Sequence, residues 1–290
     1  MNNMRADNKV NNYLKLVKFS HTIFAMPFAF IGYFLAIHQG YLFNWLTLLL
    51  VVLCMVFARN AAMSFNRYAD REIDHKNPRT ALREIPMGVV KPGSALRFVL
   101  LNSIAFFVTT GFINKLTLWL SPIALFIILG YSITKKFTFL CHFILGLGLS
   151  LAPIGAYLAV TGKFFWLPIM FSSIVLFWVS GFDIIYALQD EQFDKNENLS
   201  SIPAFIGVKQ AIWVSTIIHL ICATLVVITG FLGNFGIWYW VGASLFILLL
   251  TYQHILVKPN DLSKLNQAFF TTNGIASLVY AGFTVIDLLS

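Results

Sequence analysis

Apolar residues fill most of this chain in long runs, and short polar stretches separate one run from the next. A helix needs roughly 20 apolar residues to cross a bilayer, and most of these runs approach or exceed that length. The candidate spans are 22–38, 42–64, 96–113, 116–134, 140–160, 165–187, 210–232, 236–257 and 267–289. The pattern predicts an all-α integral membrane protein with about nine transmembrane helices. The runs tile the chain, so we treat residues 1–290 as a single domain.

The composition fits the membrane prediction. Hydrophobic residues make up 58% of the 290 positions, charged residues make up 11%, and the mean hydropathy is +0.77. Soluble domains are about half apolar and about a quarter charged. The three cysteines lie in or beside separate apolar runs, which favours neither a disulfide framework nor a metal cluster.

The net charge of +8 is divided unevenly between the two sides that nine spans create. Seventeen of the twenty Lys and Arg fall on the side of the N-terminus, whereas only Lys115 and Lys163 fall on the other, with Arg59 inside the second run. Basic residues mark the cytoplasmic face of a membrane protein. We therefore expect a multi-pass protein of a bacterial inner membrane, with the N-terminus inside and the C-terminus outside. The basic excess indicates topology and contact with the lipid bilayer, and we expect no nucleic-acid partner.

Two acidic stretches end the second and sixth apolar runs, four spans apart, so both emerge on the cytoplasmic face. Asp70 and Asp190 are 120 residues apart, close to the length of a four-span unit. This spacing predicts two parallel repeats of four helices, at about 20–135 and 136–257, with a ninth helix at about 267–289 added. Parallel repeats are a known plan of membrane proteins.

The first stretch, "FNRYADREID", places Asn66, Asp70 and Asp74 at intervals of four. On a helix, residues four apart lie on one face, so these oxygen ligands form a stripe. Closely spaced carboxylates repel one another unless a cation lies between them. The stripe is a candidate metal site.

The second stretch, "DIIYALQDEQFD", repeats the pattern with Asp183, Asp190 and Asp194. Hard oxygen ligands suit Mg²⁺, which commonly takes one or two carboxylates together with substrate phosphate oxygens. Two facing stripes predict a site for a diphosphate held through Mg²⁺, with Asp70, Asp74, Asp190 and Asp194 as catalytic candidates.

Arg59 lies inside the second run, seven residues before Asn66 and so on the same face, one to two turns deeper. A buried cation costs at least ~2.5 kcal/mol on insertion scales and usually faces the protein interior. We expect Arg59 to act in catalysis by holding the anionic group of an acceptor substrate. A structural arginine bonded to neighbouring helices is the alternative.

Further polar side chains surround the acidic stretches and are candidates for binding a diphosphate. For each base taken alone, contact with anionic lipid head groups explains the charge equally well. The candidates are Lys18, Arg71, Arg79, Lys91, Tyr131, Lys135 and Lys136.

These residues together resemble the UbiA superfamily of intramembrane prenyltransferases. The first stretch matches the family motif NxxxDxxxD, and the second matches DxxYAxxDxxxD, with Tyr186 and Ala187 inside it. Tyr131 and Lys135 match YxxxK, and Arg59 matches an arginine that the family places seven residues before its Asn. The resemblance covers the whole chain. It implies nine helices around a central cavity that opens toward the cytoplasm, and Mg²⁺-dependent transfer of a polyprenyl group from polyprenyl diphosphate to an aromatic ring.

The resemblance leaves the acceptor open. The segment "KFSHTIFAMPFAFIGY" is most similar to 4-hydroxybenzoate polyprenyltransferases, which implies an aromatic acid and quinone biosynthesis. The Arg-Asp-Arg-Pro pattern common in ubiquinone-pathway members is absent, because Phe19 to Thr22 stand there instead. The same chemistry on a naphthoate of the futalosine route to menaquinone is therefore an alternative. An alternative of another class is a multispan transporter of an anionic metabolite.

Overall fold

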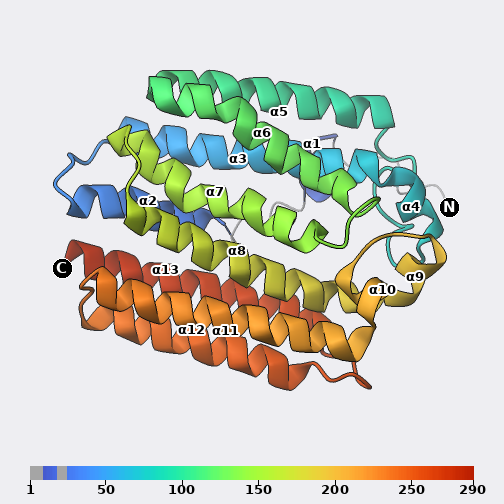
Figure 1. Ribbon diagram of the computed structural model, residues 1–290. Coiled ribbons are helices and arrows are strands. Elements are labelled where there is room, and N and C mark those ends of the chain that lie inside the picture. Colours follow the sequence, from blue (N-terminus) through green and yellow to red (C-terminus); the bar gives the residue numbers. More distant parts are fainter. Residues whose placement is uncertain (1–8, 18–24) are drawn as a thin grey trace.

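The computed structural model describes residues 9–17 and 25–290, and in this part of the chain it is a bundle of nine long or apolar helices without a strand (Figure 1). The helices are α2 (Met26–His38), α3 (Trp45–Ala69), α5 (Pro92–Ile113), α6 (Lys115–Thr134), α7 (Cys141–Thr161), α8 (Trp166–Ala187), α11 (Val208–Leu232), α12 (Ile237–Leu256) and α13 (Asn273–Leu289). Eight helical segments are long and apolar enough to cross a membrane, and α2 is a shorter apolar helix. The prediction of an all-α membrane protein with about nine spans is confirmed.

Short helices gather at one end of the bundle, where α4, α9 and α10 lie close together (Figure 1). They are α1 (Lys9–Leu16), α4 (Arg71–Lys76), the 3₁₀ turn η2 (Leu188–Asp190), α9 (Glu191–Asn196) and α10 (Ile202–Ile206). Helices α3 and α8 both end here, so the two acidic stretches meet at this end, which we call the motif end. The C-terminus of α13 lies at the opposite end (Figure 1). The division into two repeats stays a prediction.

Polar side chains at the opposite end close helix termini. The Asn44 side chain accepts hydrogen bonds from the backbone N–H groups of Leu46 and Thr47 at the start of α3, at 2.8 and 3.1 Å. Asp287 of α13 accepts a hydrogen bond from the backbone N–H of Gly236 at 2.8 Å and so caps α12. Such capping satisfies backbone donors that have no partner within the helix. These groups therefore serve the fold, in contrast to the acids of the motif end.

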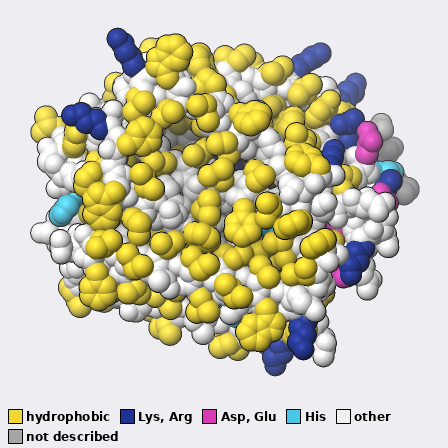
Figure 2. Space-filling model, viewed as in Figure 1, with side chains coloured by type: hydrophobic (Ala, Val, Ile, Leu, Met, Phe, Trp, Pro, Cys, Tyr) yellow, Lys and Arg dark blue, Asp and Glu magenta, His cyan; other side chains and the backbone are white. Residues whose placement is uncertain are grey.

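The largest cluster of buried hydrophobic side chains surrounds α8. Its side chains Phe171 and Trp178 are fully buried between α2, α11, α12 and α13. The face of the bundle seen in Figure 2 is covered with apolar side chains, and most of the charged side chains on it lie toward the motif end. On α6, the side chains of Trp119 and Phe126 are 77% and 79% exposed. Large apolar side chains exposed in such number are typical of a surface that contacts lipid. The protein is an integral membrane protein.

Candidate active site

A polar cavity of about 290 Å³ opens at the motif end, between α3, α6, α7, α8 and the segment after α4. Ten of the residues that the sequence predicted for the site line it: Arg59, Asn66, Asp70, Asp74, Arg79, Tyr131, Lys135, Lys136, Asp183 and Asp190. The tertiary structure thus places most of both motifs around one space, although they are more than a hundred residues apart in sequence.

The first motif lies where helix α3 breaks. Asp70 ends α3 and precedes α4, and its carboxylate accepts a hydrogen bond of 2.9 Å from the amide of Asn66. Burial, assisted by the neighbouring Asp74, raises the pKa of the Asp70 carboxyl to about 6. Asp74 pairs with Arg83 at 2.6 Å through one oxygen, and its buried Oδ2 atom has no hydrogen-bond partner in the part of the chain described.

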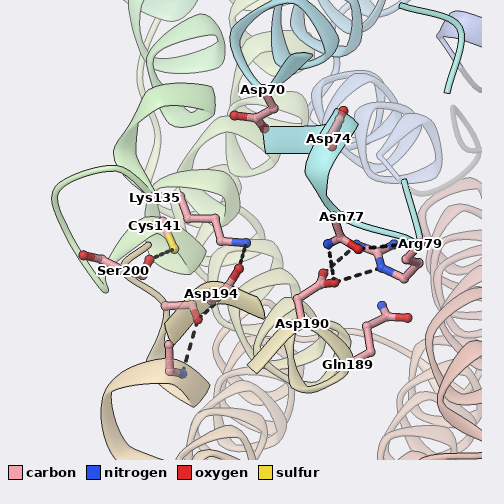
Figure 3. Close-up of polar contacts among 12 residues, drawn as sticks. Asp70, Asp74, Asn77, Arg79, Lys135, Cys141, Gln189, Asp190, Asp194 and Ser200 are labelled. Carbon is pink, nitrogen blue, oxygen red and sulfur yellow. Dashed lines mark hydrogen bonds and ion pairs between the residues drawn. The ribbon is translucent and has the colours of Figure 1, made fainter. Parts of the chain in front are cut away.

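In the second motif, Asp190 is held by the segment that follows the first motif. Arg79 donates to both oxygens of Asp190, at 3.0 and 2.5 Å, and the amide of Asn77 donates to Oδ1 at 3.0 Å (Figure 3). The sequence had assigned Arg79 to a diphosphate, and Asn77 was missed. The contacts join positions 111 and 113 residues apart, so no local spacing indicated them.

Asp183 contacts His142, a residue that the sequence motifs did not indicate. The Nδ1 atom of His142 lies 2.7 Å from Oδ2 of Asp183, and its Nε2 atom accepts the backbone N–H of Ile202 at 3.3 Å. Because Nε2 accepts, the proton lies on Nδ1 and is donated to Asp183. His142 is almost fully buried, whereas the Asp183 side chain is 22% exposed and faces the cavity. The ring therefore orients this carboxylate from behind.

Asp194 departs from the predicted stripe. The 3₁₀ turn η2 interrupts the helix between Asp183 and Asp194, so the spacing of one continuous helix no longer applies. The Asp194 carboxylate is fully buried, does not line the cavity, and binds Lys135 at 2.7 Å and Ser201 at 2.8 Å (Figure 3). Asp194 lies behind Lys135 and does not face the cavity. The prediction that it faces the site together with Asp190 is therefore corrected.

Two predicted diphosphate ligands, Arg71 and Lys91, are not part of this cavity lining. Arg71 turns away and donates to the backbone oxygen of Tyr68 and to Glu72, at 2.9 and 3.0 Å. Lys91 is exposed at the start of α5. Lys18 lies outside the described residues. Helix geometry explains why the Arg71 side chain does not face the cavity. Arg71 directly follows Asp70, and neighbouring residues on a helix project about 100° apart.

A second cavity, of about 360 Å³ and almost wholly apolar, lies among α3, α5, α6 and α7. It shares lining residues with the polar cavity: Arg59, Met63, Tyr131, Leu145 and Leu149 line both. The two spaces therefore meet at the level of Arg59 and Tyr131. An elongated molecule with a charged head and an apolar tail fits this arrangement.

Aromatic rings form the wall of the polar cavity on the side of α13. Phe269 stacks on Tyr186 with ring centroids 4.0 Å apart, and Phe270 meets the same ring edge-on. Both phenylalanines lie in a π-helical turn, η3 (Gln267–Thr272). The amide of Asn273 donates to two carbonyl oxygens of this turn, at 3.1 and 3.0 Å, and accepts a hydrogen bond from Trp178 at 3.0 Å. Turns of this kind are frequent at functional sites, and no pattern in the sequence indicated this one.

The donor set fits Mg²⁺ only in combination with a ligand. Among the described residues, no three His, Cys, Asp or Glu side chains come together as a ready-made metal site. Mg²⁺ usually takes one or two carboxylates and completes its shell with water and substrate phosphate. The lone Oδ2 atom of Asp74 and the cavity-facing carboxylates of Asp70 and Asp190 supply such oxygens.

Comparisons with known proteins agree with this geometry. A model of the UbiA prenyltransferase family matches residues 25–275. A 4-hydroxybenzoate octaprenyltransferase of Nitrosospira multiformis is 30% identical over 242 residues, which cover 83% of each chain. The apo structure of a UbiA homologue from Aeropyrum pernix K1 is 29% identical with a TM-score of 0.84, covering 92% of this chain and 98% of that one. A UbiA homologue from Archaeoglobus fulgidus, with a structure bound to GPP and Mg²⁺, is 20% identical with a TM-score of 0.73, covering 96% and 100%, and shares the fold.

Proposed function

The chain belongs to the UbiA prenyltransferase family, and from this premise we propose that it transfers a polyprenyl group from its diphosphate to the ring of an aromatic acid, in quinone biosynthesis. The observation that carries the proposal is the junction of the two cavities. A carboxylate-lined polar space meets an apolar space at Arg59 and Tyr131. The relatives named 4-hydroxybenzoate octaprenyltransferase support 4-hydroxybenzoate as the acceptor.

The diphosphate of the donor lies in the polar cavity in this proposal. Asn66, Asp70, Asp74, Asp183 and Asp190 supply the oxygens that face Mg²⁺. When bound, Mg²⁺ neutralises the negative charge that develops on the leaving diphosphate. The A. fulgidus structure with GPP and Mg²⁺ supports this pairing of metal and prenyl diphosphate.

The bases of the polar cavity change partners as substrate binds. Arg79 and Lys135 are engaged by Asp190 and Asp194. If Asp190 were held by a bound metal ion, Arg79 would be free to donate to phosphate oxygens. Lys135, Lys136 and Tyr131 act from the opposite wall.

The isoprenoid tail occupies the apolar cavity, and a tail longer than this cavity continues into the bilayer. Breaking the bond between C1 and the diphosphate oxygen leaves an allylic cation at the junction. Water would capture that cation, so the apolar lining excludes a competing reaction. The aromatic ring then attacks C1 and the C–C bond forms. The attacked ring carbon releases its proton, which restores aromaticity, and diphosphate is the leaving group.

Arg59 holds the carboxylate of the acceptor. Its guanidinium lies at the junction, and its buried Nε atom has no hydrogen-bond partner in the described part of the chain. A planar guanidinium pairs with a carboxylate through two parallel hydrogen bonds. The aromatic acid is thereby held with its ring near C1 of the donor.

A naphthoate acceptor of the futalosine route is the second candidate, because it carries the same carboxylate and the sequence lacks the Arg-Asp-Arg-Pro pattern. Transport of an anionic metabolite is disfavoured. The acids collect at the motif end, whereas transport sites lie near the bilayer midplane. We also propose that the motif end faces the cytoplasm of a bacterial inner membrane, because the basic residues concentrate there.

The test is a reaction of the purified protein with polyprenyl diphosphate, Mg²⁺ and either 4-hydroxybenzoate or a hydroxynaphthoate, with products identified by mass spectrometry. We expect a prenylated hydroxybenzoate that disappears when EDTA is present. A prenylated naphthoate alone would replace the acceptor in the proposal. No prenylated product from any aromatic acid would refute it.

A further inference from the structure

The bases that line the polar cavity differ in whether they have partners. Four are engaged: Arg79 by Asp190, Arg83 by Asp74, Lys135 by Asp194 and Lys136 by the backbone oxygen of Ala69. The other two are Arg59 and Arg67 of α3. Neither forms a hydrogen bond or an ion pair with any residue in the described part of the chain, and the Nε atom of each is buried without a partner.

Arg67 is the more deeply enclosed of these two. It is only 3% exposed, yet it lines the polar cavity. An arginine keeps its charge in proteins, and a buried charge without a counter-ion is strongly unfavourable. The described residues give this guanidinium no hydrogen-bonded acid, so an anion that enters the polar cavity can pair with it.

The two arginines lie at different levels along α3, so each can contact a different substrate anion. Arg59 lines both cavities, whereas Arg67 lines only the polar one. Eight residues separate them, or about 12 Å along the helix axis toward the motif end. Arg67 is followed three residues later by Asp70, so it lies at the level of the carboxylates that face the metal.

We propose that Arg67 binds the diphosphate of the prenyl donor, and that Arg59 and Arg67 divide the two substrate anions between the junction and the motif end. The inference rests on the proposed function for the identity of the donor. The flat fork of a guanidinium donates to two phosphate oxygens at once. Because Arg67 forms no ion pair with a described residue, its fork is available before metal or substrate arrives, unlike the side chains of Arg79 and Lys135.

The test measures binding without turnover. Inorganic pyrophosphate with Mg²⁺ is titrated calorimetrically into detergent-solubilised protein, and 4-hydroxybenzoate is titrated separately. The variants are Arg67→Met, which removes the charge, and Arg67→Lys, which keeps the charge but loses the fork. Arg97→Met is the matched control, because Arg97 is exposed on α5 and lies outside the cavity lining.

We expect Arg67→Met to weaken Mg²⁺-dependent pyrophosphate binding by about ten- to a hundredfold, the effect of one lost charge-assisted contact. Arg67→Lys recovers part of this loss, Arg97→Met has wild-type affinity, and 4-hydroxybenzoate affinity changes by less than about threefold. Removing a buried charge that has no partner also leaves the thermal midpoint of the ligand-free protein unchanged or raises it. If Arg67→Met does not fold, the loss in Arg67→Lys carries the test.

Unchanged pyrophosphate affinity in the Arg67 variants would overturn the proposal, as would a selective loss of 4-hydroxybenzoate binding. A lower thermal midpoint with intact pyrophosphate affinity would make Arg67 a structural residue. A different result would refute the proposed function alone. In that case the wild-type protein binds pyrophosphate with Mg²⁺ and the Arg67→Met variant does not, but the wild-type protein prenylates no aromatic acid.

Discussion

Replacing His142 by asparagine or by glutamine separates the two hydrogen bonds that its ring makes. The amide nitrogen of an asparagine lies where Nδ1 of histidine was, so His142→Asn keeps a donor to Asp183. The amide oxygen of a glutamine reaches the place of Nε2, so His142→Gln keeps an acceptor for the N–H of Ile202. Each variant loses the other contact.

The magnitudes follow from the geometry of each contact. The 2.7 Å contact with Asp183 involves a charged carboxylate, and such a bond contributes about 1.5–3 kcal/mol. That range corresponds to about ten- to a hundredfold in metal affinity, in line with the usual effect of removing a group that orients a metal ligand. The 3.3 Å contact with Ile202 is long, so its loss costs about 1 kcal/mol of stability or less.

The assay is titration with Mn²⁺ in the presence of pyrophosphate, followed by electron paramagnetic resonance, together with thermal unfolding of the same samples. We expect His142→Gln to bind Mn²⁺ about ten- to a hundredfold more weakly and to unfold at a lower temperature. His142→Asn should keep the Mn²⁺ affinity to within about threefold and unfold at a slightly lower temperature. Equal Mn²⁺ affinities in the two variants would refute the argument that His142 acts through Asp183.

Four further predictions address the site and the topology. Asn in place of Asp70, Asp74 or Asp190 should each lower turnover at least about a hundredfold without unfolding the protein, because the charge is lost and the size is kept; near-normal turnover in all three variants contradicts the metal site. The raised pKa of Asp70, about 6, means that this carboxyl is protonated at lower pH, so apparent Mg²⁺ affinity should be constant above pH 6 and fall about tenfold per pH unit below it. Asp70→Asn should lack this dependence in a titration from pH 5 to 8, and an identical pH profile would remove Asp70 as its source. Arg59→Lys should raise KM for the aromatic acid about ten- to a hundredfold and leave KM for the prenyl diphosphate nearly unchanged; the reverse pattern would place Arg59 with the diphosphate. Reporter fusions should place the C-terminus outside and the connections at the motif end inside, and a cytoplasmic C-terminus would contradict the odd number of spans.

Local pattern determined much of the fold. The lengths of the apolar runs predicted the helices of the bundle to within a few residues at most ends, because a span must be long and apolar whatever its neighbours are. The sorting of Lys and Arg predicted which ends share a side. The spacing of Asn66, Asp70 and Asp74 predicted a cluster of oxygen ligands, since four residues make about one helical turn.

Tertiary structure decided which groups meet at the site. Asp190 is held by Arg79, and Asp183 is held by His142, across 111 and 41 residues of sequence. The 3₁₀ turn η2 carries Asp194 out of the cavity lining. The burial of Arg67 without a hydrogen-bond partner among the described residues is also a result of helix packing, which the sequence pattern does not indicate. Spacing along a helix fixes only which face a side chain occupies, whereas its partner depends on how separate helices pack and where each helix breaks.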